Sequence, residues 1–254
     1  MHKHACAAAL RPGKTRRTPP IMNNPLKETL RHARHLPMPH REETNPEPRW
    51  PAILAGLAVG GLYMALPENL SFGPRWLLLA VVLIVQLPLV VSRYHGHHNL
   101  NQVIGHALLA VITVFMIVSL ALLVHALPLH KEPPLVLLRS AVCLWATNVL
   151  VFASWYWRLD AGGPHIRSLQ PGHRDGAFLF PQLSLDAGQR AEIGVSNWSP
   201  QFADYLFLAF NTSTALSPAD TAVLSRWAKL LMMVQATISL AVIALLAARA
   251  VNIL

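Results

Sequence analysis

The sequence predicts an all-α membrane protein with about five transmembrane helices and one short helix that is re-entrant or interfacial. Composition is the first reason: 53% of the residues are hydrophobic and only 13% are charged, whereas soluble domains carry about 25% charged residues. The second reason is that the apolar residues gather in runs of the length that crosses a bilayer. The third is a shorter apolar run near the C-terminus, which ends in polar side chains at Asn211, Thr212, Ser213 and Thr214.

Residues 1–49 are expected to form a disordered basic cytoplasmic tail, because they are rich in Pro, Arg and His and hold few large apolar residues. Residues 1–50 contain ten Lys or Arg against four acids. In a membrane protein this excess predicts contact with anionic lipid headgroups. Nucleic-acid binding is not expected, since the tail has no interleaved aromatic residues and no recognisable module. Either Met1 or Met22 could be the true start.

The first two predicted spans cover residues 51–67 and 75–91. The first is at the short end for a span. It carries Gly56 and Gly60, whose spacing lets two helices approach closely. In the second span, Pro88 is expected to kink the helix because proline lacks the backbone N–H that a helix interior requires.

Residues 105–127 and 135–157 are predicted as the third and fourth spans. Asn148 falls near the middle of the fourth, where a buried amide is expected to bond to another helix. The loop at 93–101 carries His95, His97 and His98. These imidazoles could join a metal site, but no Cys or carboxylate lies nearby in sequence to complete one. We therefore expect neither a metal nor another cofactor.

Residues 158–198 follow this four-helix transmembrane region, 50–157, as a hydrophilic linker that is too short for a domain of its own. The linker is expected to lie over the helices at the membrane surface. With the N-terminus inside, the inner segments carry fifteen Lys or Arg, whereas the outer loops carry Arg75 and Lys131, with Arg139 nearby. The positive-inside rule then predicts a cytoplasmic N-terminus and a cytoplasmic linker.

Residues 199–254 are predicted to form a short helix, a polar break and the last span. Ser199 and Pro200 suit the start of the short helix. About 14 residues at ~1.5 Å each give ~21 Å, which is shorter than the ~30 Å hydrocarbon core. The last helix is predicted to begin at Ser217, with Pro218 in its first turn and Asp220 complementing its dipole.

Two interpretations of the polar break stay open. In a symmetric oligomer its hydroxyls and its carboxylate would form rings around an axis, and the candidate pore or ion path is then Thr212, Ser213, Thr214, Ser217 and Asp220. In the alternative, the same groups only satisfy backbone atoms and cap a helix. Gln235, Thr237 and Ser239 in the last span could face such an axis or bond between helices.

Several motifs resemble an uncharacterised family of bacterial multipass integral membrane proteins. They are RWP at 49–51, GPRW at 73–76, TNVLVF at 147–152, WYWRLD at 155–160, GGP at 162–164, FPQ at 180–182, DYLF at 204–207 and AVNI at 250–253. The resemblance covers residues 50–254. It implies a multipass protein of the bacterial inner (plasma) membrane and carries no activity with it.

Residues 200–254 are also distantly similar to the pore unit of two-helix potassium channels, which contains a pore helix, a filter and an inner helix. Asp220 then stands at the filter's terminal Asp, and Thr212 and Thr214 stand at the end of the pore helix. Ser217 and Ala219 replace the two filter glycines. Since that filter needs glycine for its backbone angles, the resemblance implies a channel-like unit without potassium selectivity of that kind.

The working hypothesis is therefore a channel-like or transport protein in which several copies of the chain share a pore. The alternative is a non-conducting membrane scaffold or accessory subunit. An enzyme is not expected, because no acid–base pair, nucleophile with its base, or metal set occurs at a catalytic spacing. The expected partners are the lipid bilayer and other copies of the chain.

Overall fold

The computed structural model describes residues 47–94, 98–126, 133–169, 175–218 and 220–251. These residues are mostly helical with almost no strand, in agreement with the all-α prediction. The tail predicted at 1–49 therefore lies almost wholly outside the described residues, as do His95 and His97 of the histidine cluster and the loop around Lys131.

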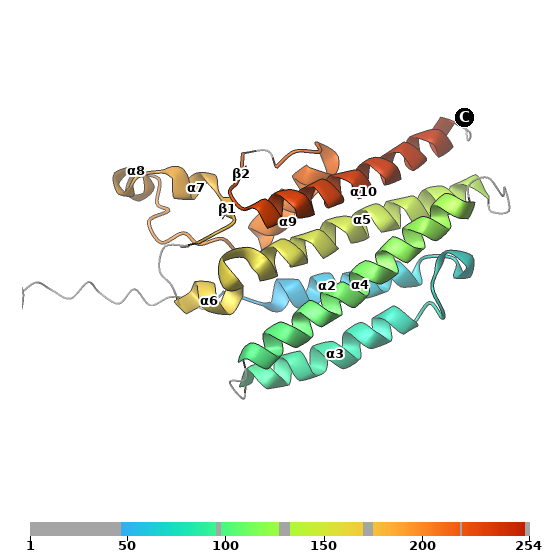
Figure 1. Ribbon diagram of the computed structural model, residues 1–254, viewed down its shortest axis with the longest axis horizontal. Coiled ribbons are helices and arrows are strands. Elements are labelled where there is room, and N and C mark those ends of the chain that lie inside the picture. The colour runs from blue at the N-terminus through green and yellow to red at the C-terminus, as the bar shows by residue number, and fades with distance from the viewer. Residues whose placement is uncertain (1–46, 95–97, 127–132, 170–174, 219, 252–254) are drawn as a thin grey trace, which may run out of the picture. The chain divides into compact units, whose positions relative to one another are not determined.

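The long helices run alongside one another in Figure 1, and most of the short elements lie toward one end of them. They are α2 (Trp50–Met64), α3 (Leu77–Tyr94), α4 (His98–Ala126), α5 (Pro134–Leu159) and α10 (Arg226–Val251). In the described part of the chain, three of them, α4, α5 and α10, are long and apolar enough to cross a membrane. The apolar parts of α2 and α3, Trp50–Met64 and Leu77–Leu89, are shorter.

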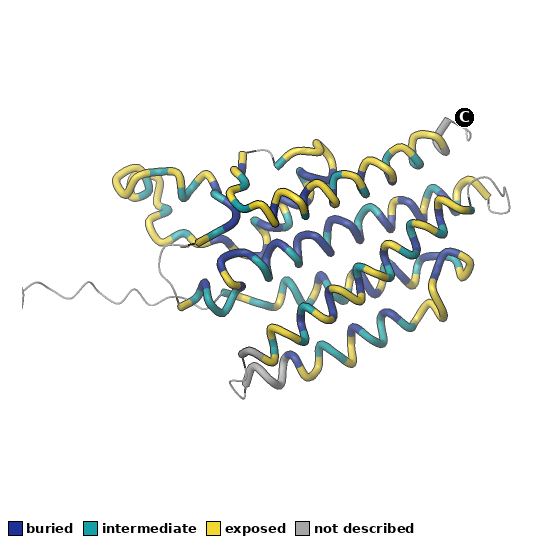
Figure 2. The backbone as a smooth tube through the Cα atoms, viewed as in Figure 1, coloured by how far each residue is buried: buried dark blue, intermediate teal, exposed yellow. Residues whose placement is uncertain are grey.

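Helix α5 lies at the centre of the bundle, in contact with α2, α4, α9 and α10. Of its most apolar stretch, 56% is buried inside the chain, against 22% for α10. Figure 2 shows this difference as the dark core along α5 and the largely exposed surface of α10. The chain therefore supplies α5 with protein neighbours and leaves most of α10 to the surroundings.

Helix α2 packs closely on α3 through its two spaced glycines. A Cβ atom at Gly60 would lie 3.0 Å from the Cα of Leu79, and one at Gly56 would lie 2.2 Å from Nε2 of Gln86. At Gly61, by contrast, a Cβ would meet nothing within 4 Å. The close approach that the glycine spacing predicts thus occurs between α2 and α3.

The loop predicted at 93–101 is wrong in its extent. Helix α3 includes Arg93 and continues to Tyr94, and α4 begins at His98, so the connection consists only of residues 95–97. The physical reason is visible at Asn101, whose Nδ2 donates to the carbonyl of Leu89 at 2.6 Å. A polar side chain assigned to a loop from the sequence instead ties α4 to α3. Pro88 lies inside α3, and the kink predicted there stays a prediction.

The short elements join the long helices. They are η1 (Glu68–Leu70), η2 (Asp160–Gly162), α6 (Pro164–Leu169), β1 (Phe178–Leu179), α7 (Pro181–Ser184), α8 (Ala187–Glu192), α9 (Phe202–Thr214) and β2 (Ala222–Val223). The two strands pair antiparallel, with Phe178 opposite Val223. This pairing ties the predicted linker, 158–198, to the C-terminal unit.

Both helix starts predicted in the C-terminal unit are wrong. Helix α9 begins at Phe202 after a capping box formed by Gln201 and Asp204, instead of at Ser199. The last helix begins at Arg226 instead of Ser217. The reason is that β2 pairs with β1 before the helix can start, and Ser225 Oγ then accepts from the N–H of Ala228 at 3.3 Å.

Candidate functional site

Helix α9 enters the bundle beside α5 and does not cross it. Its N-terminal turn lies at the end of α5, where Tyr205 bonds to Asp160, and its C-terminal turn reaches Ser239 in the middle of α10. The chain then turns back, because β2 pairs with β1 near that first end. A short helix thus goes partway along the bundle and an irregular segment returns.

The deepest contacts of α9 are hydrogen bonds between side chains of three helices. Asn148 Nδ2 on α5 donates to Ser239 Oγ on α10 at 2.7 Å. Ser239 Oγ in turn lies 2.7 Å from Ser213 Oγ on α9. All three residues are buried, so the interaction between helices predicted for Asn148 exists and joins three elements.

A second set of hydrogen bonds lies nearer the entry of α9. The hydroxyl of Tyr156 on α5 donates to Gln235 Oε1 on α10 at 2.5 Å. Gln235 Nε2 donates to the carbonyl of Ala209 on α9 at 2.7 Å. Gln235 is fully buried, and both ends of its amide are used. Two levels of polar contacts therefore hold α5, α9 and α10 together.

The candidate pore residues do not act as one group. Thr212 is buried and its hydroxyl donates to the carbonyl of Leu208 at 2.8 Å, in its own helix. Thr214 is exposed and donates to the carbonyl of Phe210 at 2.9 Å. Together with Ser213, these residues form the last turn of α9, not a break after it, so their hydroxyls satisfy helix carbonyls or bond between helices.

Ser217 and Asp220 lie in the return segment between α9 and β2. Asp220 is exposed, and the cap predicted for it is wrong because α10 begins only at Arg226. Leu216, just after α9, has a φ of 53°, in the left-handed region where glycine usually ends a helix. The return segment therefore begins with a sharp turn at an exposed leucine.

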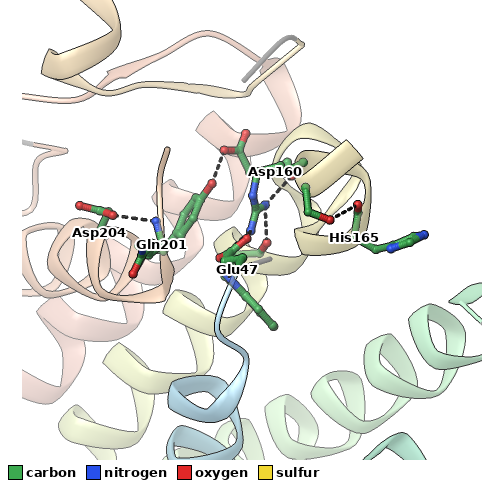
Figure 3. Close-up of polar contacts among 9 residues, drawn as sticks. Glu47, Asp160, His165, Gln201 and Asp204 are labelled. Carbon is green, nitrogen blue, oxygen red and sulfur yellow. Dashed lines mark hydrogen bonds and ion pairs between the residues drawn. The ribbon is translucent and has the colours of Figure 1, made fainter. Parts of the chain in front are cut away.

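A buried ion pair closes the end of the bundle where α9 enters, as Figure 3 shows around Glu47 and Asp160. Arg167 Nη2 lies 2.9 Å from Glu47 Oε2, and both side chains are more than nine-tenths buried. Nη1 of Arg167 donates to the carbonyls of Trp157 and Asp160, each at 2.8 Å. The indole of Trp157 also donates to Glu47. Arg167 thus satisfies carbonyls at the C-terminal end of α5.

Asp160 connects this ion pair to α9 and to β1. Its Oδ2 accepts from the Tyr205 hydroxyl at 2.6 Å, and its Oδ1 accepts from the N–H of Ala177 at 2.5 Å. The guanidinium of Arg167 stacks 5.1 Å from the centre of the Tyr205 ring. Burial raises the pKa of the Tyr205 hydroxyl well above its usual value. That hydroxyl therefore stays protonated and donates to the carboxyl.

The turn after α5 is built by three successive residues in the left-handed region. Ala161, Gly162 and Gly163 have φ values of 47°, 76° and 90°. A Cβ at Gly163 would lie 2.8 Å from the carbonyl oxygen of Arg158, so only glycine fits there. This turn brings α6 back under α5, which places Arg167 against the carbonyls it caps.

Sequence reasoning missed this end of the bundle. The sequence places Arg167 in the predicted linker and Glu47 in the predicted tail, and it gives no reason to pair them. The one signal in the sequence was the pair Gly162 and Gly163, since adjacent glycines before a proline mark a forced turn. Partners as distant as Glu47 and Arg167 leave no trace in local spacing.

No family model, curated protein or solved structure matches the chain. The two resemblances drawn from the sequence therefore stay predictions. Within the described ranges, no three His, Cys, Asp or Glu side chains gather as a metal site would require.

Proposed function

We propose that the protein is a five-span membrane protein whose α9 and α10 assemble with other copies of the chain into a channel-like unit. The spans would be α2, α3, α4, α5 and α10, with α9 as a re-entrant helix. The short apolar parts of α2 and α3 fit a span because a tilt or local thinning accommodates a length mismatch. The basic tail places the N-terminus in the cytoplasm by the positive-inside rule.

The observation that carries the proposal is the exposed return segment after α9. Ser213 meets Ser239, which lies about 20 Å along α10 from Arg226 at ~1.5 Å per residue. The turn at Leu216 would therefore lie deep within a hydrocarbon core of ~30 Å. Leu216 is 45% exposed in the single chain.

Irregular backbone cannot face lipid at that depth, because each unsatisfied N–H or C=O costs several kcal/mol there. Such backbone occurs only where protein buries it or where it lines a water-filled cavity. Other copies of the chain around a shared axis would both bury part of this backbone and enclose a water-filled cavity that the rest of it lines. Of the candidate pore residues, Thr214 and Asp220 are exposed and available to such an axis, whereas Thr212 and Ser213 are used inside the chain.

The second candidate is a non-conducting scaffold or accessory subunit. It is favoured by the satisfied hydroxyls: Thr212, Ser213 and Ser239 all bond within the chain and leave no ring of free hydroxyls. In that case the return segment is covered by protein and stays dry. The two candidates therefore differ in whether water reaches Leu216.

Thiol labelling distinguishes them. Leu216→Cys is made with Cys6→Ser, Cys143 being buried, and is treated in proteoliposomes with a charged maleimide that cannot cross the bilayer. The control is Leu240→Cys on α10, which is 54% exposed and is expected to face lipid. Labelling at 216 but not at 240 supports the channel-like unit. Absence of labelling at both positions favours the scaffold and contradicts the pore.

An ion-flux assay on the same proteoliposomes then tests conduction itself. Flux above that of protein-free vesicles, reduced by Asp220→Asn or Thr214→Ala, is the expected result. Labelling at 216 without any flux would leave a wet cavity that does not conduct, and would exclude the channel.

A further inference from the structure

A cavity of about 260 Å³ lies between α2, α3, α4 and α5, and its lining residues include none from α9. Its inner wall is apolar and includes Leu108, Leu109 and Ile112 of α4. Its other end carries two cations, Arg49 just before α2 and Arg158 in the last turn of α5. Both arginines also line a smaller adjoining cavity of about 50 Å³ that includes Gly162 and Gly163.

The cavity is elongated along the bundle. Gly105 and Ile112, both on its wall, are separated by about 10 Å along α4 at ~1.5 Å per residue. Small-molecule sites usually measure about 300–1,000 Å³. The volume therefore suits one acyl chain and part of a headgroup, not a whole two-chain lipid.

The positive charge of Arg158 has no acidic partner in the described part of the chain. The ion pairs among the described residues are Arg75 with Glu68 and Arg167 with Glu47, and neither includes Arg158. The guanidinium of Arg158 lies 5.7 Å from the centre of the Trp157 ring. A Cβ at Gly105 would come within 1.9 Å of its Nη1.

The polar neighbours of the two arginines are already committed to carbonyls of the chain. Asn101 donates to Leu89, Gln102 donates to Gly162, and Gln86 donates to Ile53. The donor that remains for a ligand is therefore the Arg158 guanidinium, and such a group forms its strongest hydrogen bonds with phosphate or carboxylate. Arg49 adds a second positive charge at the same end of the cavity.

We propose that this cavity binds an anionic lipid, with a phosphate headgroup between Arg49 and Arg158 and one acyl chain along the apolar wall. Both arginines lie at the helix ends that the charge distribution assigns to the cytoplasmic face. Basic pockets between transmembrane helices on that face bind anionic headgroups. The site does not include the return segment after α9, so it stands or falls independently of conduction.

Lysophosphatidic acid tests the site, because it combines a phosphate with a single acyl chain. The full-length protein is delipidated in detergent, and bound lipid is counted by native mass spectrometry while the thermal midpoint is recorded. We expect one molecule to bind per chain and to raise the midpoint. Lysophosphatidylcholine with the same acyl chain, and inorganic phosphate alone, are expected to do neither.

Two kinds of variant locate the binding. Arg158→Gln and Arg49→Gln remove charge, and each is expected to weaken lysophosphatidic acid binding roughly tenfold or more. Gly105→Ala keeps both charges but displaces the Arg158 guanidinium, and is expected to weaken binding similarly. Arg75→Gln, on an exposed ion pair, is the control and is expected to bind like the wild type.

The proposal is overturned if lysophosphatidylcholine binds as tightly as lysophosphatidic acid, because the arginines would then not select charge. It is also overturned if inorganic phosphate alone binds equally well, since the acyl chain would then contribute nothing. If Arg158→Gln does not fold, Gly105→Ala and Arg49→Gln decide, and unchanged binding in both contradicts the site.

Discussion

Arg158 and Arg167 lie near the same end of α5 in opposite surroundings. Arg167 is enclosed by a carboxylate, two carbonyls and a tyrosine ring. Arg158 lies against Gly105 at the edge of a cavity and has no ion pair within the described ranges. One face of α5 thus pairs its buried arginine inside the chain, and the other leaves an arginine without an ion pair. Arg167 therefore stabilises the fold, whereas Arg158 is the residue that we propose binds a ligand.

Removing one arginine from each side should separate the two roles most strongly. Arg167→Met leaves Glu47 buried without its partner, and breaking a buried pair in this way costs about 3–5 kcal/mol. Arg158→Met removes a desolvated charge that forms no described ion pair and should leave the lipid-free protein as stable as the wild type. Thermal unfolding of both variants in the same detergent checks this, and equal losses would contradict the comparison.

A second substitution tests the packing of α2 on α3, the two helices that form one wall of the cavity. Gly60→Val places atoms against the backbone of Leu79, and overpacking of this kind costs about 1–3 kcal/mol. Gly61→Val is the matched control, because a Cβ there meets nothing within 4 Å. We expect a lower unfolding midpoint for Gly60→Val alone. If both variants behave alike, α2 does not pack on α3 through this glycine.

On the side of α5 that packs against α9 and α10, loss of one hydroxyl should lower stability by a smaller amount. Ser239→Ala removes the group that joins Asn148 to Ser213, and hydrogen bonds between membrane helices contribute about 0.6–2 kcal/mol. Thr237→Ala is the control two residues away, since Thr237 is exposed and bonds only to its own helix. A midpoint loss confined to Ser239→Ala is expected. An equal loss in Thr237→Ala would show that the effect belongs to α10 alone.

The smallest expected effect is a pH dependence at the entry of α9. Burial raises the pKa of Asp204 above the ordinary value of 3.8, so the folded protein holds this proton more tightly than the unfolded chain. The free energy of unfolding should therefore fall as the pH rises from 3.8 through the raised pKa. Asp204→Asn cannot titrate and should remove this part of the slope. A slope unchanged by the substitution would assign it to another group.

The sequence is sufficient to predict the all-α fold, the helices that are long and apolar enough to cross a membrane, and the packing glycines, because composition, run length and glycine spacing are local properties. It is also sufficient for Asn148, since a mid-span amide must bond to another helix. The predicted start of the last helix, Ser217, is wrong because the pairing of β2 with β1 is a tertiary contact that overrides a good local cap.

The candidate site was less predictable than the fold for the same reason. Thr212 and Thr214 look alike in sequence, yet one is buried and the other exposed, and both bond within their own helix. In the sequence, the cavity arginines contribute only to the charge count and to two motifs, because four helices must come together before Arg49 and Arg158 share a wall. Both the polar contacts of α9 and the cavity with its two arginines are formed by segments that are far apart in the sequence.

The number of chains in one assembly tests the central proposal most directly. Native mass spectrometry of the full-length protein in nanodiscs measures it without any substitution. The exposed irregular backbone after α9 requires cover from other copies around an axis, so we predict several chains in each nanodisc. A strictly single chain would contradict the shared pore, because one short helix and one span cannot enclose a channel.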